Sequence, residues 1–436
     1  MLFRSREYAP PAVRLRAYTA FAKNVPKAAA QIRQNLRTPL PLSFVNIGKL
    51  SFGGLASYYE KDVPQAFAAV NDPQLQSEFR EANAAAVEAM KSLVAWLEEQ
   101  RPQATEAFAI GPELFQKMLS QTTRLEISLD QLEAVGRQDL ERNLAALRDA
   151  CNMYAPGKSI EQCVAKAQAS KPEGGPIEFA RRQLVELKAF VSASKIVTIP
   201  GPEEARVAES PPFMRYNTAS ISIPGPYEKD LPSIFYISPP DPAWSQAERD
   251  AYIPGKADLL FTSAHEVWPG HFLERQHTKR VPSKFGQLFS TSSAFGEGWA
   301  HYAEEMAWEA GLGNGDPETH LGQLLNALLR NVRYLSAIGM HTQGMKVEES
   351  EKMFRESAYQ DPGTARQQAA RGTFEPSYLE YTLGKLMIRK LRQDWTSTRG
   401  GRQAWGAFHD QFLSYGRAPI PLIRREMLGP NAGPPL

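Results

Sequence analysis

Residues Thr262–His277 read TSAHEVWPGHFLERQH, and this stretch contains two histidines, His265 and His271, with Glu266 directly after the first. A second stretch, Phe295–Met306, reads FGEGWAHYAEEM and carries further carboxylates. Two imidazoles, a carboxylate from a second element and a glutamate base are the parts of a catalytic zinc site. The sequence therefore predicts a metal centre that the two stretches build together.

The spacing of the histidines differs from the usual H-E-x-x-H pattern, because His265 and His271 are six residues apart. On a regular helix this spacing would put their side chains about 120° apart around the axis. Pro269 cannot donate a helical hydrogen bond, and Gly270 tolerates dihedral angles that other residues avoid. We therefore expect a helix that is distorted at these two residues, so that His271 returns to the face of His265.

The third ligand is expected on the second stretch, where aromatic and apolar residues at helical spacing mark a buried stripe. Glu297 lies on a different face, nearest the start of this helix, and is the first candidate. Glu304 and Glu305 are competing carboxylates. His301 is expected to orient a ligand or to meet the substrate.

Zinc bound by two neutral histidines and one carboxylate keeps a net positive charge, which lowers the pKa of bound water from about 15.7 toward 7. Glu266 can then accept the proton and pass it to the leaving amine. A histidine on an apolar face is usually a core residue, but six of the seven histidines lie between 265 and 341. This clustering favours a metal site over chance.

Two motifs carry a family resemblance. HEVWPGH and EGWAHYAEE resemble the H-E-x-x-P-G-H and E-G-W-A-x-Y-x-E motifs of a bacterial domain-of-unknown-function family, whose members resemble gluzincin-type zinc metallopeptidases. Arg330–His341 and Glu375–Ile388 are similar to its arginine-rich helix ending in G-x-H and to its late segment with a tyrosine before a glycine. The resemblance covers most of the chain, and it implies three ligands and a base: His265, His271, Glu297 and Glu266.

Residues on these later segments are candidates for contact with the substrate. Arginine can bind a substrate carboxylate with two parallel hydrogen bonds, which makes Arg330 and Arg333 candidates, although most helical arginines do not do this. His341 or Tyr381 can donate to the oxyanion that forms on an attacked carbonyl, and the resemblance favours both. Tyr378 is a further candidate for substrate binding.

Residues 195–242 change character, because proline, serine and β-branched residues become frequent. Three short strands are expected, SASKIVTIP, TASISIPGP and SIFYISPP, which begin at 192, 218 and 233. An edge strand beside the metal helix can pair with an extended substrate. Residues 233–238, with Phe235 and Tyr236, are the first candidate and residues 219–223 the second; the alternative is a structural hairpin.

Family members are generally longer at the N-terminus and often begin with an export or lipoprotein signal. MLFRSREYAPP contains no apolar h-region and therefore no signal peptide as written, so we expect a shortened chain whose relatives favour a periplasmic or secreted location. Cys151 and Cys163 would close a short loop in an oxidising compartment and would stay two small residues in a reducing one.

Composition excludes two classes of function. The 50 basic and 48 acidic residues leave a net charge of +2, which argues against nucleic-acid binding, and no apolar run is long enough to span a membrane. We expect a mainly α, zincin-like helical metallopeptidase fold with a small β-sheet element near an active-site cleft. Its expected parts are a helical region at 1–194, a small β-rich insert at 195–242, and a helical metal-binding catalytic region at 243–436.

The predicted activity is zinc-dependent hydrolysis of peptide bonds in short or unfolded peptides, with one zinc ion per chain. One alternative is a metal-dependent hydrolase of a non-peptide amide or ester. Another is a non-catalytic helical module that binds a peptide or a metal. Glu266 argues against the module, because a pure binder needs no base beside its first ligand. The sequence predicts no oligomeric state.

Overall fold

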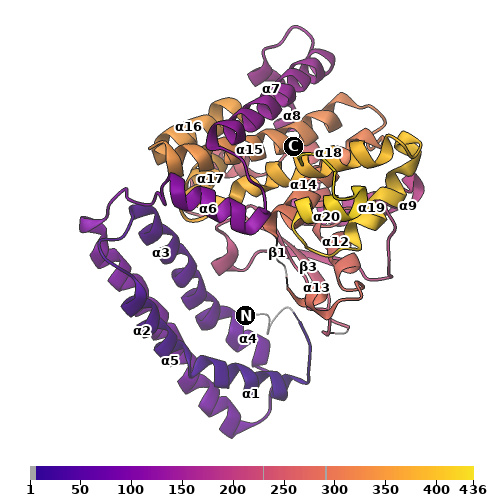
Figure 1. The fold of residues 1–436 in the computed structure, drawn as a ribbon. Helices are drawn as coiled ribbons and strands as arrows, with labels where there is room; N and C mark the ends of the chain where they lie inside the picture. Colours follow the sequence, from indigo (N-terminus) through magenta and orange to yellow (C-terminus); the bar gives the residue numbers. More distant parts are fainter. Residues whose placement is uncertain (1–5, 229, 290–291) are drawn as a thin grey trace. The chain divides into compact units, whose positions relative to one another are not determined.

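The computed structural model describes residues 6–228, 230–289 and 292–436. Helices dominate, and three short strands form one sheet, so the predicted mainly helical class with a small sheet is confirmed (Figure 1). The chain forms two compact units. Unit 1 comprises Met1–Phe108, Glu209–Thr218 and Lys229–Pro232, and unit 2 comprises Ala109–Ala208, Ala219–Glu228 and Ser233–Leu436. The three-part division predicted from the sequence follows runs of residue type and stays a prediction.

Unit 1 is helical, and its first helix ends at Ala22, just before the next begins at Val25 with Pro26 in its first turn. The longest helix begins after Asp72, whose side chain accepts a hydrogen bond from the Leu75 N–H at 3.0 Å. The elements are α1 (Pro11–Ala22), α2 (Val25–Asn35), α3 (Leu42–Ser57), η1 (Tyr58–Asp62), α4 (Val63–Phe67), α5 (Pro73–Gln100), η2 (Arg101–Gln103) and η3 (Pro212–Met214).

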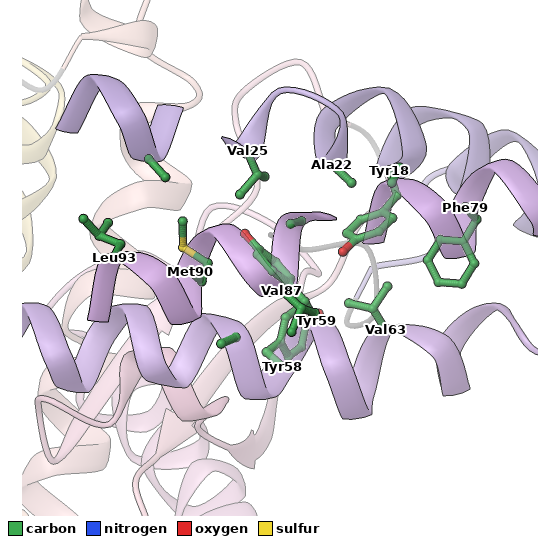
Figure 2. Packing of buried hydrophobic residues seen from close by; sticks show 14 of the residues in the cluster. Tyr18, Ala22, Val25, Tyr58, Tyr59, Val63, Phe79, Val87, Met90 and Leu93 are labelled. Atoms are coloured by element: carbon green, nitrogen blue, oxygen red, sulfur yellow. The ribbon is translucent and has the colours of Figure 1, made fainter. Parts of the chain in front are cut away.

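The core of unit 1 is apolar and aromatic (Figure 2). Tyr18 lies at its centre, with ring centroids 6.0 Å from Phe67 and 5.8 Å from Phe79. The Tyr18 hydroxyl donates to Asn83 Oδ1 at 2.5 Å, and Asn83 Nδ2 donates to the Tyr59 carbonyl at 2.9 Å. The buried polar groups at this point are therefore paired with one another.

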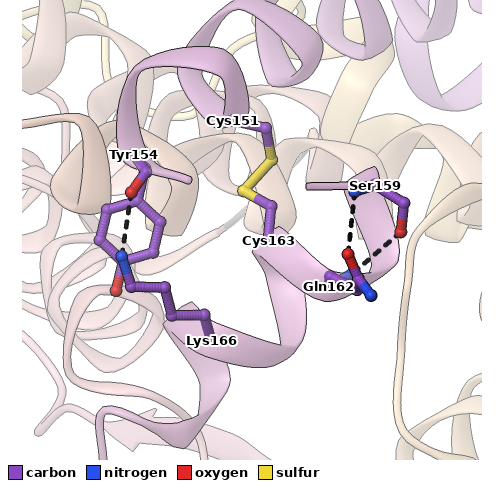
Figure 3. The surroundings of a disulfide bond; sticks show 6 residues. All are labelled: Cys151, Tyr154, Ser159, Gln162, Cys163 and Lys166. Atoms are coloured by element: carbon purple, nitrogen blue, oxygen red, sulfur yellow. Dashed lines mark hydrogen bonds between the residues drawn. A yellow bond between two sulfur atoms is a disulfide. The ribbon is translucent and has the colours of Figure 1, made fainter. Parts of the chain in front are cut away.

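Unit 2 contains most of the helices. They are α6 (Pro112–Thr123), α7 (Leu129–Tyr154), α8 (Ile160–Ala169), α9 (Gly175–Ser194), α10 (Gln246–Tyr252), α11 (Lys256–Glu266), α12 (His271–Thr278), α13 (Lys284–Leu288), α14 (Ser293–Glu309), α15 (Pro317–Thr342), α16 (Val347–Ser357), α17 (Pro362–Phe374), η4 (Pro376–Leu379), α18 (Glu380–Thr396), η5 (Gly401–Ala404), α19 (Trp405–Leu413) and α20 (Ile420–Leu428). A disulfide between Cys151 and Cys163 joins α7 to α8, so the pairing considered from the sequence is present (Figure 3).

Helices α14 and α18 pack closely along one another. A Cβ atom built on Gly298 of α14 would lie 2.5 Å from the Cα atom of Gly384, and one built on Gly384 of α18 would lie 1.9 Å from the Ala294 carbonyl oxygen. Both positions therefore need glycine. This close packing holds the second motif stretch against the helix that carries Tyr381.

The sheet has the strand order β1–β3–β2, with β1 at Ala205–Glu209, β2 at Ala219–Ser222 and β3 at Ser233–Ile237. Strands β2 and β3 are antiparallel, with Ala219 opposite Ile237. The prediction that 233–238 forms an edge strand is wrong, because β3 is the middle strand. The run SIFYI is buried at every residue, which is typical of a strand covered on both faces. The second candidate, β2, is an outer strand.

The strand predicted at 192–200 is also wrong. Helix α9 runs on to Ser194, and Lys195 ends it in the left-handed conformation with φ of 53°. Ile196 and Val197 are buried without joining the sheet. Strand β1, at Ala205–Glu209, was not among the strands predicted from the sequence. Within the described part of the chain, no helix is both long enough and apolar enough to cross a membrane.

Candidate metal centre

The helix that carries the first motif is interrupted where the sequence predicts. Helix α11 ends at Glu266, and α12 begins at His271. Between them the Gly270 N–H donates to the Ala264 carbonyl at 2.9 Å, and a Cβ atom on Gly270 would lie 1.8 Å from the His265 carbonyl oxygen. Only glycine fits this close approach. The ring centroids of His265 and His271 consequently lie 4.8 Å apart, and the predicted distortion is confirmed.

Glu297 reaches both histidines from α14. Its Oε2 atom lies 3.1 Å from His271 Nε2 and 3.7 Å from His265 Nε2. One ligand atom from each of the three residues lies within 4.8 Å of the other two, which makes them a possible metal site. The Trp299 indole N–H donates to the Pro269 carbonyl at 2.9 Å and so ties α14 to the interruption between α11 and α12.

Glu304 determines which nitrogen of His265 carries the proton. Its Oε1 atom lies 2.7 Å from His265 Nδ1. Because an ionised carboxylate only accepts hydrogen bonds, Nδ1 must donate, and Nε2 presents a lone pair toward Glu297. Glu297 Oε2 is buried and accepts no hydrogen bond from the described residues. The lone pairs of His265 Nε2 and Glu297 Oε2 face one another, an arrangement that a cation stabilises, so the three residues fit a metal ion.

The charges around the ligands are balanced by specific partners. Burial would raise the pKa of Glu297, but His271 and His265 outweigh it and hold this pKa well below its usual value. Burial would likewise raise the pKa of Glu304, but Arg330 and His301 lower it. Arg330 Nη2 lies 3.4 Å from Glu304 Oε1. Both carboxylates are therefore ionised at neutral pH.

Glu266 is the last residue of α11 and is buried. Burial raises its pKa to about 7, with Glu297 and Glu304 acting in the same direction and His271 opposing them. Its carboxylate makes no hydrogen bond or ion pair with any residue in the described part of the chain. By contrast, His265 contacts Glu304 and His271 contacts Glu297. This carboxylate is thus available to a water molecule or a substrate.

The two candidates for oxyanion stabilisation differ. The Tyr381 ring stacks on His265, with centroids 5.9 Å apart and planes 14° apart, and its hydroxyl accepts from Arg371 Nη2 at 3.1 Å. The hydroxyl proton of Tyr381 donates to none of the described residues. His341 uses both ring nitrogens, because Nε2 lies 2.7 Å from the Gly372 carbonyl and Nδ1 accepts from the Ile110 N–H at 3.4 Å. The geometry favours Tyr381.

Three residues predicted to bind the substrate, Arg330 and Arg333 on α15 and Tyr378 on η4, contact different groups. Arg330 donates to the Asn326 carbonyl at 3.0 Å and lies beside Glu304. Arg333 Cζ lies 4.8 Å from the Tyr381 ring centroid. Tyr378 is fully buried, and its hydroxyl occupies the space that a Cβ on Gly372 would need.

Several other predicted residues lie deeper in the unit. His301 is fully buried with Nδ1 at 3.5 Å from Glu304 Oε2, and burial lowers its pKa to about 4. It supports Glu304 and is closed to solvent. Glu305 pairs with Arg142 at 3.0 Å and turns away from the ligands. The side chains of Phe235 and Tyr236 are buried in the middle strand.

The sequence predicted Glu304 only as a competing ligand and did not predict any role for Arg371. Glu304 holds His265, and its spacing of seven residues from Glu297, two helical turns, was a signal that both share one face. Arg371 binds the Tyr381 hydroxyl, and nothing in its local sequence marks it.

Two solved structures are similar to this chain. One is of a protein from Shewanella oneidensis described as a lipoprotein of unknown function, with a TM-score of 0.74 and 26% identity, covering 96% of this chain and 79% of that one. The other is of a protein from Colwellia psychrerythraea described as a lipoprotein, with a TM-score of 0.79 and 20% identity, covering 95% and 75%, and this likeness concerns the fold.

Among curated proteins, no relative matches the chain. Residues 2–427 match a family of bacterial proteins of unknown function, DUF885. This match spans both units and includes the three convergent residues and Glu266. The chain therefore belongs to the DUF885 family.

Proposed function

We propose that this protein is a zinc-dependent hydrolase of the gluzincin type that cleaves peptide bonds. One observation carries the proposal: His265, His271 and Glu297 converge from three helices, while the unpaired carboxylate of Glu266 lies directly beside them in the chain. A site that only stored zinc would be closed by four protein ligands, whereas three ligands and a base are typical of catalysis.

Zinc bound here would supply Lewis-acid chemistry. Glu266 accepts the proton of the attacking water and passes it to the leaving amine. The Tyr381 hydroxyl donates to the oxygen that becomes negatively charged, and Arg371 holds that hydroxyl in place. Glu304 keeps His265 in the tautomer that points a lone pair at the site.

An outer strand beside the metal helix favours a peptide substrate over a small non-peptide amide or ester. Strand β2 lies at the edge of the sheet and packs against α11. An extended peptide can add to such an edge through main-chain hydrogen bonds, and a small amide cannot. Because only an extended chain can pair in this way, we propose short or unfolded peptides as substrates within a zincin-like fold.

The zinc content of the purified protein tests the proposal. We expect about one zinc ion per chain by elemental mass spectrometry, and its loss in each of His265→Ala, His271→Ala and Glu297→Ala. His320→Ala is a matched control, because His320 stacks on Trp308 and is no part of the convergent set. Wild-type protein that takes up no zinc, or zinc-loaded protein that cleaves no peptide, would contradict the proposal. Peptide or metal binding without turnover would favour the non-catalytic module.

We also propose that the protein works outside the cytoplasm. The Cys151–Cys163 disulfide fits an oxidising compartment, and the two similar structures are described as lipoproteins, which is compatible with a secreted or periplasmic protein. Alkylation of unreduced protein followed by mass spectrometry should find both cysteines blocked. Two reactive thiols in protein from its native host would contradict this location.

A further inference from the structure

Arg333 on α15 is a buried cation whose charge no carboxylate neutralises. Its side chain is almost fully buried, with a relative exposure of 4%. Its Nε donates to Gln368 Oε1 at 2.8 Å, but none of the described carboxylates forms an ion pair with it. Its terminal nitrogens donate to no described residue, yet they are not sealed from solvent. The guanidinium thus keeps two terminal nitrogens that could donate to a ligand.

A neighbouring arginine, Arg371, has the carboxylate partner that Arg333 lacks. Arg371 on α17 forms two hydrogen bonds with the Glu375 carboxylate, one of them at 2.8 Å. Its third nitrogen, Nη1, is buried and donates to no described residue. Burial and the nearby charge of Arg371 together lower the pKa of Arg333 to about 10. Arg333 remains a cation at neutral pH, and the Glu375 carboxylate, which acts against this lowering, is hydrogen-bonded to Arg371.

The aromatic contact of Arg333 does not replace a carboxylate partner. The guanidinium lies 4.8 Å from the Tyr381 ring centroid, which is a favourable cation–π contact. Such a contact recovers only part of what a guanidinium loses when it leaves water, and a bidentate carboxylate recovers more. A purely structural arginine at this position would be expected to have a carboxylate partner, as Arg371 does.

Tyr381 connects this unpaired cation to the metal centre. The same ring stacks on His265, with centroids 5.9 Å apart. The distance from Arg333 Cζ to the centre of the His265 ring is therefore no greater than these two distances added together. An extended peptide advances about 3.3–3.6 Å per residue, so this span holds at most about three residues. A ligand anchored on Arg333 would therefore place a bond close to its own end at the metal centre.

We propose that Arg333 binds the C-terminal carboxylate of the substrate, and that the enzyme trims peptides from their C-terminal ends. This inference rests on the proposed peptidase function and adds the class of substrate to it. A terminal carboxylate is planar and matches a guanidinium with two parallel hydrogen bonds. An internal peptide segment offers no such anion.

Peptide binding without turnover tests the inference. The probe is a pair of acetylated tetrapeptide pools of randomised sequence, one with a free C-terminal carboxylate and one with a carboxamide. Binding is measured by calorimetry on zinc-loaded Glu266→Gln protein. We expect the carboxylate pool to bind roughly 10- to 100-fold more tightly. Adding Arg333→Gln should remove this preference, and adding Arg333→Lys should restore part of it.

A buried arginine outside the site provides the matched control. Arg392 on α18 pairs with Glu309 at 2.7 Å, so Arg392→Gln removes a buried guanidinium of the same kind and should leave the carboxylate preference unchanged. Zinc content and thermal unfolding of every variant separate lost recognition from lost folding. The comparison of the two pools on protein with Arg333 intact does not depend on any arginine variant folding.

Cleavage positions provide an independent result. Wild-type zinc-loaded protein should release one to about three residues from the C-terminal end of free-carboxylate peptides, read by mass spectrometry. Equal binding and cleavage of the two pools would overturn the inference while the peptidase proposal stands. Failure of the wild-type protein to cleave any peptide would overturn both.

Discussion

Helices α5 and α15 have similar lengths, 28 and 26 residues, but they bury different kinds of surface. Helix α5 in unit 1 buries one stripe, and Asn83 is the only polar side chain in it. On α15 in unit 2 every residue from Leu321 to His341 is buried. That set includes the polar residues Gln323, Asn326, Arg330, Asn331, Arg333, Ser336 and His341.

The difference separates a helix that supports a fold from one that also serves a site. A single apolar stripe is what packing against a core requires. Polar and charged groups buried on all sides are costly unless each finds a partner. Asn83 has two partners, whereas Arg333 has only one neutral partner for its charge. Such an exception on α15 is where a ligand is expected.

Replacing Glu266 by glutamine should produce the largest effect in the molecule. The change keeps the shape of the side chain but removes the proton acceptor, so turnover should fall by about 10²- to 10⁴-fold while zinc stays bound. Peptide hydrolysis and elemental mass spectrometry measure the two quantities. Glu186→Gln, on the exposed face of α9, is the control. Full activity of Glu266→Gln would show that Glu266 is not the catalytic base.

Asp139→Ala should give the largest loss of stability. Asp139 Oδ2 accepts from Lys385 Nζ at 2.7 Å and from Asn331 of α15 at 2.8 Å, and both charged side chains are buried. Removing Asp139 leaves the buried Lys385 with only the more distant Glu305 at 3.5 Å, and breaking such a buried pair costs about 3–5 kcal/mol of unfolding free energy. Urea denaturation measures the change. Glu141→Ala on the exposed face of α7 should change stability by less than about 0.5 kcal/mol.

Acid should destabilise unit 2 through Glu305. Burial would raise its pKa, but Lys385, Arg142 and Arg389 outweigh it and lower the pKa from 4.5 to about 2. Its contribution is fully present above pH 4.5 and is lost as the pH falls toward 2, because the unfolded chain takes up the proton first. We expect a loss on the order of 3–4 kcal/mol, because a shift from 4.5 to about 2 corresponds to about 1.4 kcal/mol per pKa unit.

Denaturation of wild type and Glu305→Gln at several pH values isolates this contribution of Glu305. The difference in unfolding free energy between the two proteins should shrink as the pH falls through this window. A difference that stays constant with pH would show that the ion pairs around Glu305 do not lower its pKa in the folded protein.

The smallest expected effect lies in unit 1. Tyr18→Phe removes the hydroxyl that donates to Asn83 but keeps the ring in the aromatic core, so the loss should be about 1 kcal/mol. Thermal or urea unfolding measures it against Tyr216→Phe, whose side chain is partly exposed. A loss as large as that expected for Asp139→Ala would show that the buried polar group of α5 matters as much to stability as those around α15.

Sequence patterns predicted the helices well where periodic apolar residues meet clear ends. The helix of the second motif stretch, α14, and the interruption between α11 and α12 follow from such patterns. They failed for short runs such as the one around Ile196, because β-branched residues favour a strand only when another strand pairs with them. The middle position of β3 also depended on its partners, since no local pattern reports strand order.

The sequence by itself determined that two histidines, a neighbouring glutamate and a later carboxylate lie in two motifs, and that Gly270 permits a turn between the histidines. These are local properties of residue type and spacing. The tertiary structure alone decided that Tyr381 lies against His265 while His341 binds backbone groups, and that Arg333 lacks a carboxylate partner. Such facts depend on which distant segments meet, and spacing along the chain does not specify those contacts.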